Sequence, residues 1–347
     1  MNSLHCDKIV QGPHSKSSFL GQVFKSLLFL RVFVLLISVQ GFAQKVHGTD
    51  WLKNAQYGVL VHYLHLLQNT KEPWNQGKIT SWNSCVNAFD AKKFAADISE
   101  TGARYVIFTT QQNDQFFSCP NSTFEKISGY KRGVATPHRD LINDIYLALK
   151  AKGIALMLYV TGNGPYKDEH ALNAMNNRTL ATFVNSWSKV LKDISLRYKA
   201  KVKGWWVDGA YPFIGYNDSL LAVLRTALKS GNENAIVAFN QAPKDSVSFY
   251  TSLDDYTAGE MNHINSFPKA RFIRNAQWHA VTFLGKEWGV PGLRFRKDEV
   301  VNYVTSCNRK GGVVTLDVCL LRDGSIDAIQ KEFLKSIKYL IKAGKKI

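Results

Sequence analysis

The sequence lacks several features that mark particular classes of protein. It has 5 cysteines in 347 residues, and they do not fall at the close spacing of a metal site. No G-x-G-x-x-G motif follows an early strand-like segment, which argues against a dinucleotide-binding open sheet. Internal repeats, low-complexity tracts and nucleic-acid-binding motifs are also missing. We therefore expect no metal, no organic cofactor and no nucleic-acid partner.

Acidic residues are scarce relative to basic ones. The chain has 27 Asp and Glu against 44 Lys and Arg, which gives a formal net charge of +17. An excess of this size favours anionic partners, such as acidic or sulfated polysaccharides. The Lys residues are scattered along the chain, so a solvated basic surface explains the charge equally well.

No apolar run is long enough for a transmembrane helix, since the run from Leu27 to Ser38 is short and contains Arg31. Basic residues precede this run and small residues follow it, as in a secretory signal peptide. We expect residues 1–44 to be a leader and signal peptide. Residues 45–347 would then be exported to the periplasm or outside the cell, without a membrane span. Export would permit disulfides among the four remaining cysteines, which are equally compatible with free thiols.

From residue 51 onward, strand-like and helix-like segments alternate. The predicted strands are short, apolar and rich in β-branched or aromatic residues; they span Tyr57–Tyr63, Ala103–Thr110, Ile154–Thr161, Val202–Gly209, Ala235–Asn240 and Gly312–Val318. The predicted helices between them are amphipathic; they span residues 89–98, Asp140–Lys152, Leu180–Tyr198, Asn217–Ser230 and Ile326–Ala343. This alternation predicts a parallel sheet, and the length favours one α/β domain with a (β/α)8 TIM-like barrel.

In such a barrel the active site lies at the carboxyl ends of the strands. Asp208 ends the run Lys203-Gly204-Trp205-Trp206-Val207-Asp208, so its carboxyl group is a catalytic candidate, although a helix cap is an equally simple role. Hydrolysis of a glycosidic bond needs a second carboxyl group, and Glu260 follows a short strand-to-loop segment downstream. The sequence alone cannot give the distance between the two.

Six short motifs in the right order make the chain similar to the α-L-fucosidases of glycoside hydrolase family 29. They are Tyr57–His62, Phe89–Ala91 with Ala103–Thr110, Arg139–Leu141 with Gly153–Tyr159, Trp206–Asp208, Tyr256–Glu260 and Lys310–Ile326. The resemblance implies a retaining exo-glycosidase with Asp208 as nucleophile and Glu260 as acid/base. It also implies an oligosaccharide or polysaccharide substrate. The β-sandwich that often follows this barrel in the family is not expected.

The resemblance further implies which residues bind the sugar, and several of them depart from the family pattern. His62, Tyr159 and Trp206 match the pattern. The family's two histidines after the second strand correspond to Gln112 and Asn113, which never carry charge. Trp82 and Trp278 keep tryptophans of the family pattern, but the Glu residues beside them correspond to Ser81 and His279, and an Arg of some members corresponds to Gln241. The resemblance implies that Trp82, Gln241, Trp278 and His279 also bind the sugar. Three hypotheses follow: an α-L-fucosidase, a glycosidase of the same lineage acting on another α-linked sugar, or a glycan-binding protein without turnover.

Overall fold

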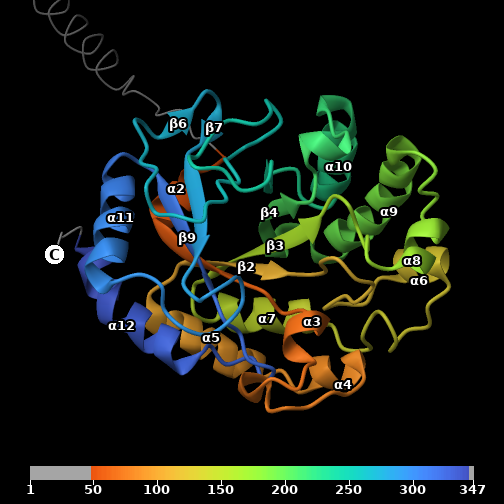
Figure 1. Cartoon of the computed structure of the whole chain (residues 1–347). Coiled ribbons are helices and arrows are strands. Elements are labelled where there is room, and N and C mark those ends of the chain that lie inside the picture. Colours follow the sequence, from red (N-terminus) through yellow and green to blue (C-terminus); the bar gives the residue numbers. More distant parts are fainter. Residues whose placement is uncertain (1–47, 344–347) are drawn as a thin grey trace, which may run out of the picture. The chain divides into compact units, whose positions relative to one another are not determined.

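The computed structural model describes residues 48–343 (Figure 1). The expected leader and signal peptide, residues 1–44, lies outside the described residues. Within residues 48–343, no helix combines the length and the apolar character that crossing a membrane requires. Cys85, Cys119, Cys307 and Cys319 are buried, free thiols in this structure.

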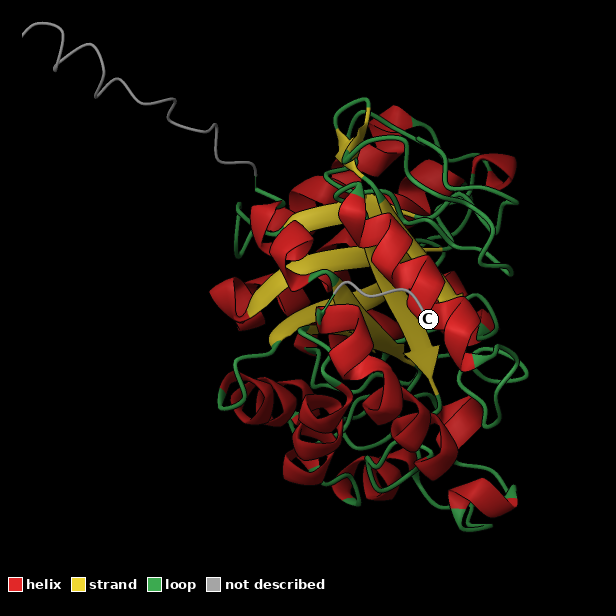
Figure 2. Cartoon of the chain, turned by 90° about the vertical axis from the view of Figure 1, so that its left-hand side faces the viewer, coloured by secondary structure: helices red, strands yellow, loops and turns green. Residues whose placement is uncertain are grey.

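A single seven-stranded parallel sheet forms the centre of the protein, in the order β5-β4-β3-β2-β1-β9-β8. Figure 2 shows that the sheet curls and that helices lie outside it. The strands are β1 (Tyr57–Val61), β2 (Tyr105–Thr109), β3 (Ala155–Thr161), β4 (Val202–Asp208), β5 (Ile236–Phe239), β8 (His279–Phe283) and β9 (Val313–Val318). Six of them confirm predicted strands to within two residues at each end. The strand β8 was missed.

Only seven regular strands occur in the sheet of the described part, rather than the expected eight. Between β5 and β8 the chain makes a short hairpin, β6 (Phe272–Ile273) with β7 (Ala276–Gln277), and otherwise runs as loops. Within this connection, residues 255–261 exchange backbone hydrogen bonds with both β5 and β8. They form only isolated bridges, such as the one between Glu260 and Val281. The structure is therefore a curled, TIM-like α/β sheet.

The helices pack their apolar faces against the outside of the sheet. The longer ones are α5 (Ala91–Thr101), α7 (Leu141–Lys150), α9 (Leu180–Tyr198), α10 (Asp218–Lys229), α11 (Lys297–Arg309) and α12 (Ala328–Lys342). The short ones are α2 (Asp50–Ala55), α3 (His65–Gln68), α4 (Trp82–Asn87), α6 (Ser122–Ser128) and α8 (Glu169–Ala174). Five of the six longer helices match predicted helices, and α11 was missed. Asp140 and Asn217 begin two of them by accepting backbone N–H groups, as N-caps do.

Strand alternation sorts the side chains into two cores. On β4, Trp205 and Val207 point toward the outer helices, whereas Trp206 points into the curl of the sheet. The inner core is crowded: a Cβ atom at Gly58 would lie 2.4 Å from the ring of Tyr105. The same alternation continues past the strand ends. It therefore directs the polar residues that follow each strand toward one enclosed space.

Candidate active site

Asp208 ends β4 and receives three side-chain hydrogen bonds. Its Oδ2 accepts from the Tyr159 hydroxyl at 2.5 Å, and its Oδ1 accepts from the Tyr211 hydroxyl at 2.6 Å and from Asn240 Nδ2 at 2.9 Å. These donors come from β3, from the loop after β4 and from the residue after β5. Three donors from three different segments fix the orientation of the carboxyl group. Burial and the Asp208 charge raise the pKa of Tyr159 and of Tyr211 above their usual value, so both hydroxyls stay protonated donors.

Glu260 shares the side-chain amide of Asn240 with Asp208. Asn240 Nδ2 donates to Glu260 Oε2 at 2.5 Å while it also donates to Asp208 at 2.9 Å. The two accepting oxygens therefore lie no farther apart than the sum of these two distances. Burial and the charge of Asp208 raise the pKa of Glu260 to about 7, against smaller opposing effects of Asn240 and His62. One carboxyl group is thus held by three hydrogen bonds, and its neighbour, Glu260, keeps a proton to higher pH than an ordinary glutamate.

His62 lies beyond the end of β1 and is oriented by Asp317 of β9. His62 Nδ1 is 2.8 Å from Asp317 Oδ1, and Asp317 Oδ2 accepts the backbone N–H of Gly289 at 2.6 Å. The imidazole packs edge-on against Tyr159 and Trp288, with ring centroids 5.7 and 5.9 Å away. Asp317 therefore ties His62 to the loop that carries Trp288.

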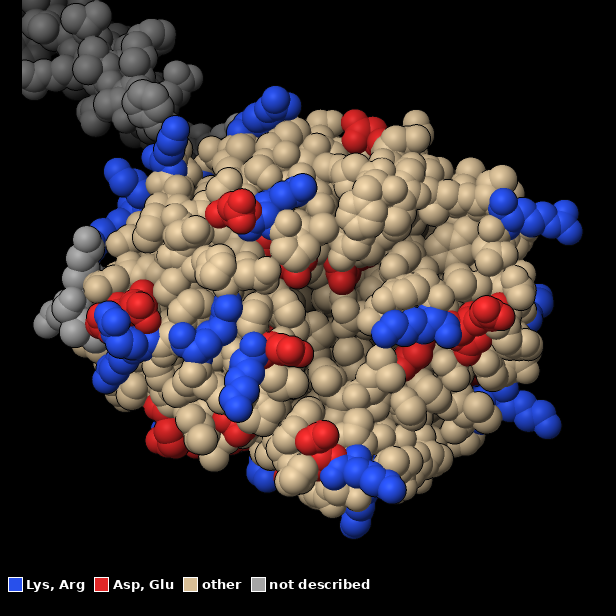
Figure 3. Space-filling model, viewed as in Figure 1, with Lys and Arg blue, Asp and Glu red and all other residues tan. Residues whose placement is uncertain are grey.

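These groups share a pocket of about 240 Å³. Its polar lining comes from His62, Gln112, Asn113, Tyr159, Asp208 and Glu260, and its apolar lining from Leu60, Leu64, Leu66, Leu67, Trp206 and Trp288. Trp206 stacks on Tyr159 and donates its indole N–H to the Ala258 carbonyl. These contacts fix the position of the Trp206 ring in the pocket wall. Figure 3 shows a hollow near the centre of the visible face, with Asp and Glu atoms at its edge. The volume and mixed lining suit one sugar ring.

Gln112 and Asn113 reach the pocket from a loop that is held in place. Asn113 has a φ of 68°, in the left-handed region that Asn tolerates better than most residues. The Asn113 carbonyl accepts the backbone N–H of Lys167 at 2.8 Å. The side chain of Gln111, at the start of the loop, donates to the Asp114 carbonyl and accepts from the Thr161 hydroxyl. Fixed amide groups can both donate to and accept from sugar hydroxyls.

Seven of the eleven predicted site residues come together at this pocket, and four do not line it. Trp82 is buried and donates its indole N–H to the Phe117 carbonyl. Gln241 bonds to Ser248 and lines a small neighbouring cavity with Glu260. Trp278 and His279 are buried at the start of β8, where His279 bonds to Thr257 and Thr315. Burial lowers the pKa of His279 to about 4, so it is neutral.

The site also contains Asn240, which follows an apolar strand segment, and Asp317, which lies one residue before the end of another. The polar switch at a strand end indicates both residues in the sequence. Tyr211 and Trp288 lie in loops and carried no such signal. Within residues 48–343, no group of three or more His, Cys, Asp or Glu side chains is arranged to hold a metal ion.

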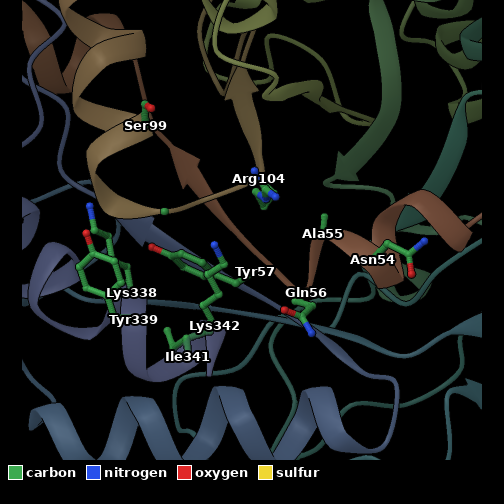
Figure 4. A pocket seen from close by; sticks show the side chains of 11 residues that line it. Asn54, Ala55, Gln56, Tyr57, Ser99, Arg104, Lys338, Tyr339, Ile341 and Lys342 are labelled. Atoms are coloured by element: carbon green, nitrogen blue, oxygen red, sulfur yellow. The ribbon is translucent and has the colours of Figure 1, made fainter. Parts of the chain in front are cut away.

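A second hollow, of about 350 Å³, lies at the opposite ends of β1 and β2 (Figure 4). Tyr57 and Arg104 from the strand starts and Lys338 and Lys342 from α12 line it. No carboxyl group lines this hollow in the described part of the chain, so it cannot supply a catalytic acid and base. The carboxylate-lined pocket is therefore the candidate active site.

A curled, TIM-like sheet with a carboxylate-lined pocket at the carboxyl ends of its strands is an arrangement found among glycoside hydrolases. The sequence model described as α-L-fucosidase matches residues 38–345, so the chain belongs to the α-L-fucosidase family. This match confirms the family that the sequence motifs indicated. None of the curated protein sequences compared with the chain matches it.

Solved structures of similar fold include enzymes of two glycoside hydrolase families. An endo-fucoidan hydrolase of family 107 has a TM-score of 0.68 at 14% identity, over 86% of this chain and 95% of that chain. Another enzyme of that family has a TM-score of 0.66 at 15% identity over 85% of this chain, which spans only 53% of that protein's length. A family 29 α-L-fucosidase from Bacteroides thetaiotaomicron has a TM-score of 0.60 at 16% identity, over 86% and 74% of the two chains. At these identities the likeness is one of fold.

Proposed function

We propose that the protein is a retaining exo-glycosidase that releases a terminal α-linked L-fucose. The observation that carries this proposal is the single Asn240 nitrogen that bonds to both Asp208 and Glu260, at 2.9 and 2.5 Å. Retaining glycosidases hold their two carboxyl groups about 5 to 5.5 Å apart, and inverting ones about 6.5 to 9.5 Å apart. The shared donor keeps Asp208 Oδ1 and Glu260 Oε2 no farther apart than the sum of the two hydrogen-bond distances, which favours the retaining spacing over the inverting one.

The two carboxyl groups also differ in the way that this mechanism needs. Asp208 attacks the anomeric carbon while Glu260 gives its proton to the departing glycosidic oxygen. The Glu260 carboxylate then takes a proton from a water molecule, which attacks the same carbon and releases Asp208. A pKa of about 7 suits Glu260 to both roles, and the three hydrogen bonds hold the Asp208 carboxyl group in a fixed orientation for attack.

The pocket lining supports a sugar that carries both hydroxyl groups and an apolar substituent. His62, Gln112 and Asn113 offer hydrogen bonds, whereas Leu60, Trp206 and Trp288 offer apolar surface. No Lys or Arg is among the described residues that line the pocket. A neutral 6-deoxy sugar matches this surface better than a sugar acid does. Anionic groups of a polysaccharide would then contact the basic residues outside the pocket.

Chemical rescue of the nucleophile tests the proposal. The wild-type protein should release the aryl group of an aryl α-L-fucoside, and Asp208→Gly should not. Azide added to Asp208→Gly should restore release and yield the β-fucosyl azide, because azide then attacks from the face that Asp208 occupied. Phe267→Gly, a substitution of an exposed residue outside the pocket, is the matched control. Activity that Asp208→Gly retains without azide would contradict the assignment of the nucleophile.

A second candidate is an endo-acting hydrolase of a fucose-containing, sulfated polysaccharide. The net charge of +17 and the fold shared with endo-fucoidan hydrolases favour it. The two candidates differ in their first products, since an exo-enzyme releases monosaccharide while the polymer stays long. An endo-enzyme shortens the polymer before any monosaccharide appears. Size-exclusion chromatography of early digests separates the two.

A glycan-binding protein without turnover is the weakest of the three hypotheses. Binding alone does not require two carboxyl groups that face one another, and placing them together has an electrostatic cost. The azide experiment decides this as well, since a pure binder releases no aryl group under either condition.

We also propose that the protein acts outside the cytoplasm, on the basis of the signal-like segment in residues 1–44. Expression of the full chain in its host, followed by N-terminal sequencing of the protein in each cell fraction, tests this. A mature N-terminus near Lys45 in an exported fraction is the expected result. An intact Met1 in the cytoplasmic fraction would contradict it.

A further inference from the structure

An aromatic pair stands beside the candidate nucleophile. The Tyr211 hydroxyl donates to Asp208 Oδ1 at 2.6 Å, and the Tyr211 ring stacks on Phe213 with centroids 4.9 Å apart and planes inclined by 30°. Phe213 has 73% of its surface exposed, the largest exposure among the large apolar side chains of residues 48–343. One end of the pair therefore touches the reacting carboxylate, and the other end faces solvent.

The segment that carries the pair is firmly held. Pro212–Ile214 form one turn of 3₁₀ helix directly after the nucleophile strand. The Tyr250 hydroxyl donates to the Ala210 carbonyl at 3.0 Å, and the Tyr216 hydroxyl donates to the Gly162 carbonyl at 2.7 Å. Anchors on both sides of Phe213 keep its ring exposed without relying on contacts of the ring itself. A surface that is fixed before binding costs less entropy to occupy.

We propose that Tyr211 and Phe213 form the subsite that binds the sugar next to the scissile bond, on the leaving-group side. This proposal rests on the proposed glycosidase function. The leaving group departs on the side of Glu260, opposite the attacking oxygen of Asp208. Tyr211 bonds to the same Asp208 oxygen, Oδ1, as the Asn240 nitrogen that also donates to Glu260, so Tyr211 lies on the side of the two carboxyl groups where the neighbouring sugar departs. The C–H face of a pyranose can pack on the exposed aromatic surface, while its hydroxyls remain in water. The ligand class is a neutral or weakly charged pyranose of the acceptor glycan.

Two substrates with the same fucosyl group isolate this subsite. α-L-Fucosyl fluoride has a one-atom leaving group that cannot reach Phe213, whereas an oligosaccharide ending in α-L-fucose can. In Phe213→Ala, kcat/KM for the oligosaccharide should fall about ten-fold, a typical effect of removing an aromatic contact. The value for the fluoride should stay unchanged. Phe213→Trp should retain the wild-type value for both substrates, because it keeps an aromatic face.

Phe267→Ala is the matched control, because Phe267 is also exposed and packs on an aromatic ring, that of Tyr303, but does not line the pocket. It should change neither kinetic value. Equal kcat/KM values of Phe213→Ala and Phe267→Ala for the oligosaccharide would overturn the subsite. The thermal midpoint of each variant shows that a loss is not caused by unfolding.

Failure of the proposed function gives a different pattern. If the wild-type protein cleaves neither substrate, calorimetric titration with the intact oligosaccharide replaces the kinetics. Binding by the wild type and Phe267→Ala that is lost in Phe213→Ala would support the aromatic subsite without turnover. Equal binding by all three proteins, or no binding by the wild type, would overturn it.

Discussion

The imidazole of His62 and the carboxylate of Asp317 face each other across the ends of two neighbouring strands, with Nδ1 2.8 Å from Oδ1. A carboxylate only accepts hydrogen bonds, so this contact places a proton on Nδ1. The other ring nitrogen, Nε2, makes no hydrogen bond that involves the described residues, and the side chain lines the pocket, so Nε2 is available to a ligand there. Asp317 also accepts the Gly289 N–H, so one buried side chain orients both His62 and the loop of Trp288.

We predict that Asp317→Asn lowers kcat/KM by about ten-fold through misorientation of His62. Asn offers one acceptor oxygen where the structure needs two, so either His62 or Gly289 loses its partner. The measurement is a double-mutant cycle with His62→Ala, using an aryl α-L-fucoside. If Asp317 acts through His62, the second substitution should cost little further activity in the His62→Ala background. Fully additive losses would contradict this coupling. Asp298→Asn, an exposed acid in an ion pair with Arg296, is the control.

We predict that the activity toward natural glycosides falls as the pH rises through about 7, where Glu260 loses its proton. Glu260 must be protonated to assist a poor leaving group, but fluoride departs without a proton. The pH profile of kcat/KM should therefore show an alkaline limb with an oligosaccharide and lack it with fucosyl fluoride. An identical limb with both substrates would assign the titration to another group.

The raised pKa of Glu260 also makes the stability of the folded protein depend on pH. The pKa of Glu260 is higher in the folded protein than its usual value of 4.5, so the folded state binds more protons between pH 4.5 and about 7. Stability therefore falls as pH rises through this window. Glu260→Gln removes the charge and should raise the thermal midpoint at pH 8 relative to wild type, with little change at pH 4.

Much of the fold follows from the sequence, because six strands were predicted from short apolar runs with β-branched and aromatic residues. The strand β8 was not predicted, since its five residues, His279–Phe283, begin with a polar residue and include only three apolar ones, Ala280, Val281 and Phe283. The segment around Glu260 forms isolated bridges instead of a strand, and only tertiary contacts define its path.

The site was predictable where a polar residue follows an apolar strand, as at His62 and Asp208. His279 shows the limit of this reasoning. Its side chain points into the interior, but it begins β8, and the carboxyl end of that strand lies about 13 Å farther on at about 3.3 Å per residue. Because the sequence did not give the bounds of β8, it could not show whether His279 lies at the amino end or at the carboxyl end of the strand. Trp288 depends on the path of a loop, which carries no periodic pattern at all.

We predict that His279 contributes to stability and not to sugar binding. Its ring is fully buried. Nε2 forms a hydrogen bond with the Thr315 hydroxyl at 2.7 Å, and Nδ1 forms one with the Thr257 carbonyl at 2.9 Å. His279→Ala leaves a cavity and unpaired polar groups, so the free energy of unfolding should fall by about 2 to 3 kcal/mol. Urea unfolding measures this loss, and KM of the folded variant should match wild type. A raised KM with unchanged stability would contradict this prediction and indicate that His279 contributes to sugar binding.

Asn240 offers the sharpest test of how the two carboxyl groups are tuned. Its amide hydrogen bond lowers the pKa of Glu260 against the effects of burial and of Asp208. In Asn240→Ala the ionised form of Glu260 loses this support, so the alkaline limb of the pH profile should move to higher pH. Asp208 also loses a donor, and kcat/KM at the optimum should fall about 10²-fold, as when one donor to a reacting oxygen is removed.

Gln241→Ala is the matched control for Asn240→Ala, because Gln241 is the next residue and its side chain bonds to Ser248 at 2.7 Å instead of to either carboxylate. It should leave the alkaline limb where it is in the wild type. A limb that stays in place in Asn240→Ala would mean that Asn240 does not stabilise the Glu260 carboxylate. A limb that moves to lower pH would contradict that stabilisation directly.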